Sequence, residues 1–447
     1  MPIELFGTDG IRGVPGEFPL DDRTLYWIGR TLGEYLRRSG VGPRVLIGMD
    51  TRESSPHIAE KIAAGLAAAE ATPAFAGVIT TPGIACLVRR KGFSAGVVIS
   101  ASHNPFHDNG VKLFSATGMK FPDEVEEELE REIEKRRDRD AAHGRVSLQA
   151  DPSLDAEYVA FLRSRMTVGA TLSAMRLVLD CAHGAASRLG PALFSSLGAE
   201  VVAIHDQPDG RNINAGCGSL HPQSVQKKVV ETRAALGVAF DGDADRAVFV
   251  SASGQLVNGD GVLLAAARYL KSVARLKGAS VVGTTMANLG LERALAAEGL
   301  GLVRVAVGDR YVLEEMLRSG CNLGGEQSGH IIFLDDATTG DGLLTALKVA
   351  CLVSLQGPLD ELVKDLQIFP QTIVNVKVRS KPPLDLLPEV SSVLAEAQRS
   401  LGDSGRIVLR YSGTEPLARV MVEAERIEDV ERWAAAIASA IRSSLGA

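Results

Sequence analysis

The sequence has no long hydrophobic run, and this absence limits the kind of protein it encodes. No stretch of its 447 residues approaches the roughly 18 apolar residues of a membrane-spanning helix. The opening residues, Met1 to Gly7, contain no basic segment followed by an apolar core, as a secretory leader would. We therefore predict a cytoplasmic protein with no membrane partner.

Closely spaced cysteines and clustered basic residues are also missing. No C-x-x-C pair occurs, which argues against a zinc knuckle or a redox dithiol and favours buried thiols in a reducing compartment. The chain has 48 Lys and Arg against 55 Asp and Glu, and no basic run long enough to follow a nucleic-acid backbone. We expect no nucleic-acid partner. The five cysteines are Cys86, Cys181, Cys217, Cys321 and Cys351.

What the sequence does contain is an α/β pattern that occurs three times. Each copy has an apolar strand, a turn rich in Gly, Asp or Thr, an Ala- and Leu-rich helix and a second strand. Such runs predict parallel or mixed sheets covered by helices. The three strand–helix–strand copies are expected at 44–50, 58–71 and 74–79, at 175–180, 187–197 and 200–204, and at 279–284, 289–298 and 302–307.

The C-terminal part has a different pattern, with strands expected at 371–378, 406–411 and 418–425 and helices at 386–400 and 427–444. A chain of 447 residues exceeds one ordinary core, so several domains are expected. We predict an α/β fold with three related α/β domains with mixed sheets, plus a smaller C-terminal α+β domain, around one central cleft. The predicted domains are residues 1–150, 151–254, 255–367 and 368–447.

The first candidate site segment runs from Ser100 to Pro105 and follows an expected strand at 95–99. Loops at the carboxyl ends of strands are where α/β folds place ligands, so we expect Ser102 to be exposed at a sheet edge. Lys112 follows at a spacing that could return its ammonium group to the same loop. A serine hydroxyl is a poor nucleophile without a base or a metal, and a turn with local hydrogen bonds is the alternative.

The second segment, Asp241-Gly242-Asp243-Ala244-Asp245-Arg246, directly follows an apolar strand at 236–240. Alternating carboxylates can converge on one hard cation, and Mg²⁺ binds few carboxylates together with phosphate oxygens and water. Without a positive charge between them the three carboxylates would repel one another, which disfavours a plain acidic turn. Arg246 and Ala252 occupy positions where an EF-hand needs Gly and Glu. We predict one Mg²⁺ per chain.

The third segment, from Gly324 to His330, has groups suited to a sugar. Its three glycines let the backbone approach a ligand, while Glu326, Ser328 and His330 offer donors and acceptors for hydroxyls. It is not a P-loop, because His330 follows Gly329 and this segment contains no Lys-Ser or Lys-Thr pair. A structural turn is an equal alternative.

The fourth segment, from Arg410 to Pro416 with Arg419 beyond it, has groups suited to a phosphate. Two guanidinium groups match phosphate geometry, and small hydroxylated residues expose backbone N–H groups. A hairpin turn would also use Ser-Gly-Thr but would not need both arginines. Together the four segments describe phosphoryl transfer on a phosphorylated sugar.

In this order the segments resemble the α-D-phosphohexomutase superfamily along essentially the whole chain. Further motifs resemble its branch that acts on glucosamine phosphates, although Leu220 stands where that branch usually has Thr. The branch that acts on glucose and mannose phosphates typically has Met in place of Gln327 and His in place of Asp309. The supporting motifs are Phe6–Gly13, Gly210–Asn214, Cys217–Ser219, Asn288–Leu291 and Val307–Arg310.

The resemblance implies an enzyme that interconverts glucosamine 6-phosphate and glucosamine 1-phosphate through a phosphoserine and a 1,6-bisphosphate. It would feed the synthesis of UDP-N-acetylglucosamine and cell-wall precursors. The glucose or mannose branch is the nearest alternative. An aspartyl-phosphate phosphatase built on Asp241 and Asp243, and a sugar-phosphate sensor without catalysis, are the alternatives from other classes.

The resemblance also implies roles for individual residues, a C-terminal domain that hinges over the site, and a partner that is a phosphorylated amino sugar. The oligomeric state is left open between monomer and homodimer. Covalent phosphate would be carried by Ser102, and Mg²⁺ would be held by a phosphoserine oxygen of Ser102 with Asp241, Asp243 and Asp245. Sugar hydroxyls would contact Glu326 and Ser328, and the non-reacting phosphate would contact Arg410, Ser412, Gly413, Thr414 and Arg419. The supporting catalytic residues would be Lys112, His103, His330, Arg12 and Arg246.

Overall fold

The computed structural model describes residues 5–7, 10–137, 139, 146–412 and 416–446. The chain forms two units, one of residues Met1–Thr284 and Val305–Val363, the other of Thr285–Arg304 and Lys364–Ala447. The two units are described separately below. No helix among the described residues is both long and apolar enough to cross a membrane.

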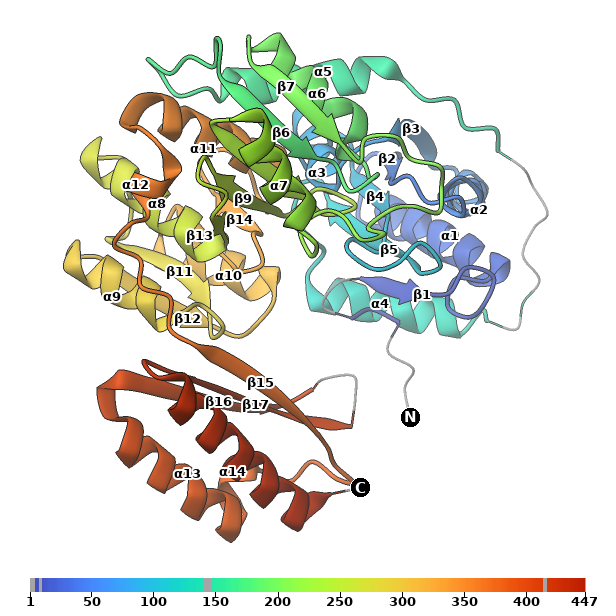
Figure 1. The fold of residues 1–447 in the computed structure, drawn as a ribbon. Helices are drawn as coiled ribbons and strands as arrows, with labels where there is room; N and C mark the ends of the chain where they lie inside the picture. Colours follow the sequence, from blue (N-terminus) through green and yellow to red (C-terminus); the bar gives the residue numbers. More distant parts are fainter. Residues whose placement is uncertain (1–4, 8–9, 138, 140–145, 413–415, 447) are drawn as a thin grey trace. The chain divides into compact units, whose positions relative to one another are not determined.

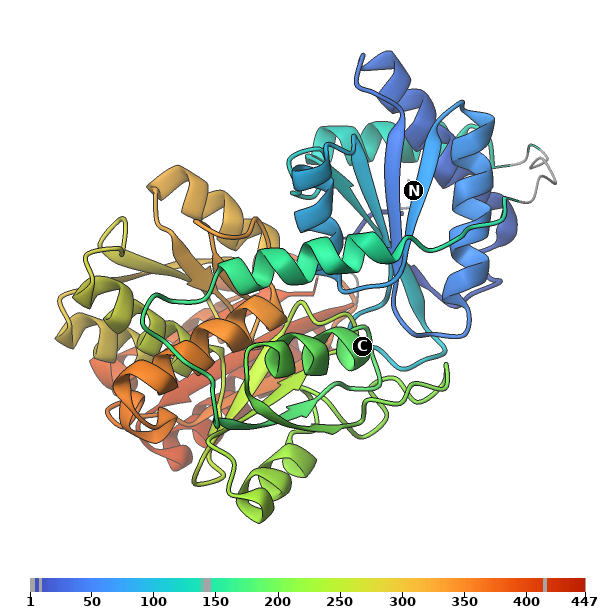
Figure 2. The ribbon, with the colours of Figure 1, turned by 90° about the horizontal axis from the view of Figure 1, so that it is seen from above.

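The first sheet of the larger unit has the strand order β1-β5-β4-β2-β3, and helices cover both of its faces (Figures 1 and 2). Strand β2 runs parallel to β3 and β4, while β5 and β1 are antiparallel additions. Since β4 is the middle strand, the chain that follows Ile99 leaves the sheet at its centre. The elements are β1 (Ile11–Gly13), α1 (Asp22–Arg38), β2 (Arg44–Met49), α2 (Ser55–Ala68), β3 (Thr72–Val78), α3 (Thr81–Lys91), β4 (Ala95–Ile99), β5 (Asn109–Ser115) and α4 (Asp123–Glu134).

The second sheet follows the same plan with the order β10-β9-β8-β6-β7. Strand β6 is parallel to β7 and β8, and β9 and β10 continue the sheet in antiparallel fashion. All five residues of β8 are buried, so the loop after Phe240 begins at the centre of a covered sheet. The elements are α5 (Pro152–Ser164), β6 (Arg176–Asp180), α6 (Ala186–Ser196), β7 (Glu200–Ile204), α7 (Gln223–Thr232), β8 (Leu236–Phe240), β9 (Ala247–Ser251) and β10 (Leu256–Val257).

The third part of the larger unit again joins a parallel strand pair, β11 and β13, to an antiparallel strand, β14. The turn between β13 and β14 contains Glu326 and Ser328. The prediction of mixed sheets covered by helices is therefore confirmed. The elements are α8 (Gly259–Ser272), β11 (Ser280–Thr284), α10 (Asp309–Ser319), β13 (Leu323–Gly325), β14 (Ile331–Phe333), α11 (Gly342–Gln356) and α12 (Leu359–Leu362).

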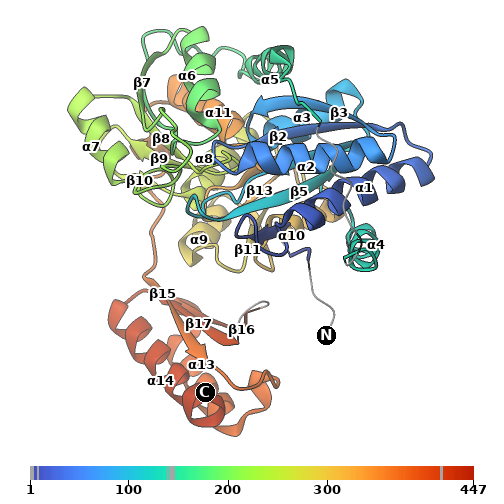
Figure 3. The same cartoon turned by 90° about the vertical axis from the view of Figure 1, so that its right-hand side faces the viewer.

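The smaller unit contains an antiparallel sheet with the order β15-β17-β16. Helices α13 and α14 lie beside each other on this sheet and enclose its apolar core (Figure 3). The predicted C-terminal α+β arrangement is confirmed. The elements are α9 (Leu289–Ala297), β12 (Gly301–Val305), β15 (Gln371–Lys377), the 3₁₀ turns η1 (Leu384–Leu386) and η2 (Gly402–Ser404), α13 (Pro388–Leu401), β16 (Gly405–Tyr411), β17 (Leu417–Ala424) and α14 (Ile427–Leu445).

The predicted strands and helices are observed with small shifts at their ends. Helix α2, for example, begins at Ser55 rather than Ile58. Pro56 lies in its first turn, where the missing N–H group costs no hydrogen bond and the fixed φ suits a helix. Apolar periodicity identified the body of this helix but not the polar turn that starts it.

Candidate active site

Ser102 lies in the loop that connects β4 to β5, with a left-handed backbone φ of 52°. Its exposed fraction is 1%, so the expectation of an exposed serine was wrong. The loop is covered because the aspartate-rich segment after β8 packs on it, and a Cβ atom at Gly242 would come within 2.5 Å of the Ser102 carbonyl oxygen. Glycine is therefore needed at 242, and the Ser102 hydroxyl donates to Asp241 Oδ2 at 2.6 Å.

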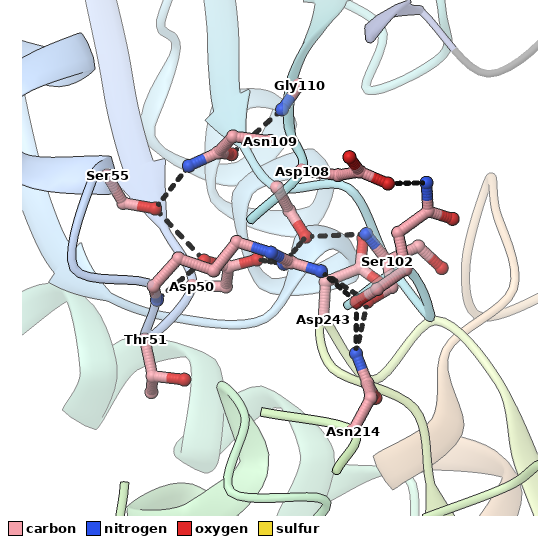
Figure 4. Close-up of polar contacts among 12 residues, drawn as sticks. Asp50, Thr51, Ser55, Ser102, Asp108, Asn109, Gly110, Asn214 and Asp243 are labelled. Carbon is pink, nitrogen blue, oxygen red and sulfur yellow. Dashed lines mark hydrogen bonds and ion pairs between the residues drawn. The ribbon is translucent and has the colours of Figure 1, made fainter. Parts of the chain in front are cut away.

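Two side chains hold the serine loop by the same pair of carbonyl oxygens (Figure 4). Arg52 Nη2 donates to the carbonyls of Ser102 and Asn104 at 3.2 and 2.6 Å. Asn214 Nδ2 donates to the same two carbonyls at 2.9 and 3.0 Å. A non-glycine residue in the left-handed region is strained, so the surrounding contacts must hold it there.

The Arg52 side chain is fully buried and forms an ion pair with Asp50. Asp50 Oδ1 also accepts hydrogen bonds from the Arg52 N–H and the Ser55 hydroxyl, both at 3.0 Å. Arg12 Nη1 contacts the same loop, since it donates to Asn104 Oδ1 at 3.2 Å. Paired and hydrogen-bonded, the buried charge of Arg52 is tolerated and gives the loop a rigid support.

The three aspartates of the second segment converge with their carboxylate oxygens within 4.8 Å of one another. Asp241 Oδ1 accepts from the Arg246 N–H at 3.1 Å. Asp243 Oδ2 accepts from the Thr81 hydroxyl at 2.5 Å. The Oδ1 atoms of Asp243 and Asp245 are buried and have no hydrogen-bond partner among the described residues. Buried oxygens without donors fit a hard cation, so these residues can hold a metal ion.

Lys112 supplies positive charge to the cluster. Its Nζ lies 2.7 Å from Asp243 Oδ2 and 3.2 Å from Asp245 Oδ2. Burial lowers the pKa of Lys112, but the charges of Asp243 and Asp245 outweigh burial and leave that pKa raised. Burial and the charges of Asp245 and Asp243 raise the pKa of Asp241 well above its usual value. Asp243 and Asp245 thus share the one ammonium group of Lys112.

His103 lies between the serine and Arg246. Its Nδ1 atom is 3.4 Å from the Ser102 hydroxyl oxygen and 3.2 Å from Arg246 Nη1. Burial, together with the charges of Arg246 and Arg12, lowers the pKa of His103 to about 4. The ring is therefore neutral at pH 7, and its Nδ1 accepts a hydrogen bond from Arg246.

A pocket of about 120 Å³ adjoins this cluster and brings the third segment to it. Glu326 Oε1 accepts from the Gly308 N–H at 3.2 Å, and the Ser328 hydroxyl lies 3.5 Å from Glu326 Oε2. Ser328 does not itself line the pocket, whereas Glu326 and His330 do. The lining residues are Thr81, Lys112, Phe114, Lys120, Asp245, Arg246, Val307, Gly308, Asp309, Glu326, His330 and Thr339.

The fourth segment lies in the smaller unit. Strand register places Arg410 opposite Arg419, and Arg419 Nη2 donates to the Ser412 hydroxyl at 3.4 Å. Burial and the charge of Arg419 lower the pKa of Arg410. Two guanidinium groups held side by side favour an anion between them. Gly413 and Thr414, also predicted for this site, lie outside the described residues.

A second set of potential metal ligands lies near the carboxyl end of β6 in the second sheet and consists of Asp180, His205 and Cys217. Asp180 accepts from the Ala182 N–H at 2.9 Å and from the Gly218 N–H at 3.1 Å. Burial, with a contribution from Asp180, raises the pKa of the Cys217 thiol to about 12. Because backbone donors already occupy the carboxylate and the thiol keeps its proton, this set fits a structural role.

Sequence reasoning did not single out Arg52, Asn214 or Thr81 for the site. A topological signal existed, because Arg52 follows β2 and Thr81 follows β3. Strand β2 is parallel to β4, the strand that precedes the serine loop, and β3 is parallel to β2. Carboxyl ends of parallel strands meet at one edge of a sheet. Asn214 belonged to a motif that supported the resemblance, but its partners are more than 100 positions away in sequence.

Four family models match the chain in order, all described as phosphoglucomutase/phosphomannomutase domains. Alpha/beta/alpha domain I matches residues 4–140, domain II residues 156–254, domain III residues 258–369, and the C-terminal domain residues 373–440. Together these matches follow the chain almost from end to end.

Solved structures show the same fold. A phosphoglucomutase/phosphomannomutase family protein from Burkholderia thailandensis is 25% identical, with a TM-score of 0.82 over 98% of this chain and 97% of its own. N-acetylphosphoglucosamine mutase from Aspergillus fumigatus, solved in complex with GlcNAc-6P and magnesium, is 18% identical, with a TM-score of 0.66 over 99% of this chain and 96% of its own.

Curated relatives are more similar in sequence. Phosphoglucosamine mutase from Solibacter usitatus is 52% identical over 447 residues, which cover 100% of both chains. Phosphoglucosamine mutase from Koribacter versatilis is 52% identical over 452 residues, which cover 99% of this chain and 97% of the relative. With its fold and these full-length similarities, the chain belongs to the phosphoglucosamine mutase family.

Proposed function

We propose that the chain interconverts glucosamine 6-phosphate and glucosamine 1-phosphate, with Ser102 as the phosphoryl carrier. The observation that carries this proposal is the 2.6 Å hydrogen bond from the Ser102 hydroxyl to Asp241. That carboxylate belongs to a cluster in which Asp243 and Asp245 keep buried oxygens without donors. A hydroxyl beside a cation site is the arrangement that phosphoryl transfer needs.

In the first half-reaction the P–O bond to Ser102 Oγ breaks, and a P–O bond to the free sugar hydroxyl forms. The proton of the sugar hydroxyl ends on Ser102 Oγ, which returns to a hydroxyl group, and the product is the 1,6-bisphosphate. The bisphosphate then turns end for end, and its other phosphoryl group returns to Ser102 Oγ. No phosphate is consumed over the cycle.

The residues around Ser102 act chiefly by position and charge. When bound at Asp241, Asp243 and Asp245, Mg²⁺ supplies positive charge to the phosphoryl oxygens. Lys112 and Arg246 add two cations that line the adjoining pocket. Arg52 and Asn214 fix the direction of the serine side chain through its backbone. Since Lys112 is held as an ammonium ion, it acts as a hydrogen-bond donor in this arrangement rather than as a base.

We propose the remaining roles as follows. Glu326, Ser328 and His330 contact the sugar, and Arg12 and His103 support the serine loop.

The four domains are residues 1–150, 151–254, 255–367 and 368–447, and the last hinges over the site. The five cysteines are free and buried, which supports a reducing, cytoplasmic location. The product would supply UDP-N-acetylglucosamine synthesis. The residues that bind the distal phosphate are Arg410, Ser412, Gly413, Thr414 and Arg419.

An isomerisation assay with the purified chain tests this function. Glucosamine 6-phosphate, glucose 6-phosphate and mannose 6-phosphate are compared at saturating Mg²⁺ with a trace of the matching 1,6-bisphosphate. We expect the highest kcat/KM with the glucosamine phosphate. A higher kcat/KM with glucose or mannose phosphate would place the activity with the neighbouring branch, and turnover of none of the three would contradict the proposal.

A further inference from the structure

Asp309 begins helix α10 and presents its carboxylate to the pocket beside the serine cluster. Its Oδ1 accepts from Lys120 Nζ at 2.7 Å and from the Arg310 N–H at 2.8 Å. Its Oδ2 lies 3.9 Å from His330 Nε2, which is too long for a hydrogen bond. No described residue donates a hydrogen bond to Oδ2, so one oxygen of this carboxylate is available to a ligand.

His330 does not satisfy that oxygen. Its Nε2 accepts a hydrogen bond from the Gly340 N–H at 3.2 Å. In the neutral ring the proton is therefore on Nδ1, and Nε2 has no hydrogen to donate to Asp309. His330 thus leaves Oδ2 without a donor.

The carboxylate of Asp309 is ionised. Burial alone would raise its pKa, but the charge of Lys120 and the hydrogen bond from Lys120 outweigh burial and hold the pKa well below its usual range. The other two carboxylates that line the pocket have other surroundings. Asp245 belongs to the candidate cation cluster and contacts Lys112, and Glu326 accepts from the Gly308 N–H.

We propose that Asp309 is the residue that selects an amino sugar, by accepting a hydrogen bond from the ammonium group at C2 of the substrate. This inference rests on the proposed mutase function and names the group that recognises its substrate class. An ammonium donor to a carboxylate forms a charge-assisted bond, which is roughly twice as strong as the bond that a neutral C2 hydroxyl would form. Glucose and mannose phosphates carry only the hydroxyl at C2, so Asp309 would favour the glucosamine phosphate.

A purely structural role is the rival explanation, because Asp309 also orients Lys120. In that case Asp309 would act through the lysine, and its loss would affect every hexose phosphate alike. Lys120→Gln is the matched variant, since it removes the ion pair but keeps the Asp309 carboxylate. Asp309→Asn keeps the size of the side chain and removes its charge.

The test measures kcat/KM for glucosamine 6-phosphate and glucose 6-phosphate with the full chain and both variants. It also measures the Kd of both sugars by calorimetry in the Ser102→Ala background. We expect Asp309→Asn to lower kcat/KM and weaken binding of the glucosamine phosphate by about 10- to 100-fold, as for hydrogen bonds to charged groups. The values for glucose 6-phosphate should change less than about threefold, and Lys120→Gln should affect both sugars alike.

Equal losses for the two sugars in Asp309→Asn, or a Lys120→Gln profile that also singles out the glucosamine phosphate, would overturn the inference. The calorimetric comparison does not depend on turnover. If the unmodified chain isomerises neither sugar, the mutase proposal fails, while the ratio of the two Kd values still decides the role of Asp309.

Discussion

Two neighbouring strands of one sheet, β6 and β8, both reach an aspartate at their carboxyl ends, yet the two aspartates do different things. Asp180, the last residue of β6, accepts hydrogen bonds from two backbone N–H groups. Asp241, directly after β8, accepts from the Ser102 hydroxyl and belongs to a group of three buried carboxylates. The strands are parallel and hydrogen-bonded to each other, so topology alone does not separate the two sites.

The difference lies in what the surrounding chain donates. At Asp180 the loops fold so that backbone donors satisfy both carboxylate oxygens, and the aspartate fixes the loops. At Asp243 and Asp245 one oxygen each is buried without a donor, which is costly unless a cation binds there. A carboxylate near a strand end can become a metal ligand where no hydrogen-bond donor of the surrounding chain satisfies its oxygens.

Replacing one aspartate near each strand end with asparagine should give the largest difference between the two sites. Asp243→Asn should lower kcat by about 10²- to 10³-fold, because it removes a charge from the cation site. Asp180→Asn should leave kcat within about threefold but lower the free energy of unfolding by about 1–3 kcal/mol, because a buried backbone donor loses its acceptor. Steady-state kinetics and urea denaturation measure the two effects. Similar kcat losses in both variants would remove the distinction.

Metal binding should separate the two strand ends directly. After treatment with a chelator, calorimetric titration with Mg²⁺ should show one site per chain, which Asp180→Asn retains. Asp245→Asn should weaken that site by at least about tenfold, since it removes a ligand charge. Equal weakening in both variants, or a second Mg²⁺ site that Asp180→Asn abolishes, would place a metal at β6 as well.

Arg52 supports the serine loop without being a candidate ligand of the cation, so it tests the role of positioning alone. Arg52→Lys keeps the charge but loses the fork that reaches two carbonyl oxygens, so kcat should fall by about 10- to 100-fold through misplacement of Ser102. Arg37→Lys, an exposed arginine paired with exposed Glu70, is the matched control and should change nothing measurable. An unchanged kcat in Arg52→Lys would show that Asn214 suffices.

Asp341 is another buried aspartate of the larger unit, and replacing it should have the smallest effect of the substitutions predicted here. Burial raises its pKa to about 6, although it accepts hydrogen bonds from Tyr158 and the Leu344 N–H. Because the folded-state pKa is above the unfolded one, this group stabilises the fold below pH 4 and loses that contribution as the pH rises to 6. Relative to Asp341→Asn, the free energy of unfolding should fall by about 2 kcal/mol over this range. A constant difference between the two proteins would contradict the raised pKa.

Much of this arrangement could be predicted from the sequence, because it depends on local patterns. Continuous apolar runs identified β4 and β8, and polar residues that follow such runs identified Ser102 and the three aspartates. The burial of Ser102 could not be predicted, since it depends on Gly242 packing against a loop from another sheet. Arg52 and Asn214 are ordinary residue types in ordinary loops. Their roles arise from contacts between segments that are far apart in the sequence.

The most direct test of the central claim is the mass of the intact protein together with its activity. The purified chain should contain a fraction heavier by one phosphoryl group, which peptide mapping places on Ser102 and which resists hydroxylamine. Ser102→Ala should lack this fraction and isomerise glucosamine 6-phosphate at least about 10⁴-fold more slowly, as expected when a covalent nucleophile is lost. An alanine variant that isomerises the sugar phosphate at the native rate would contradict the account.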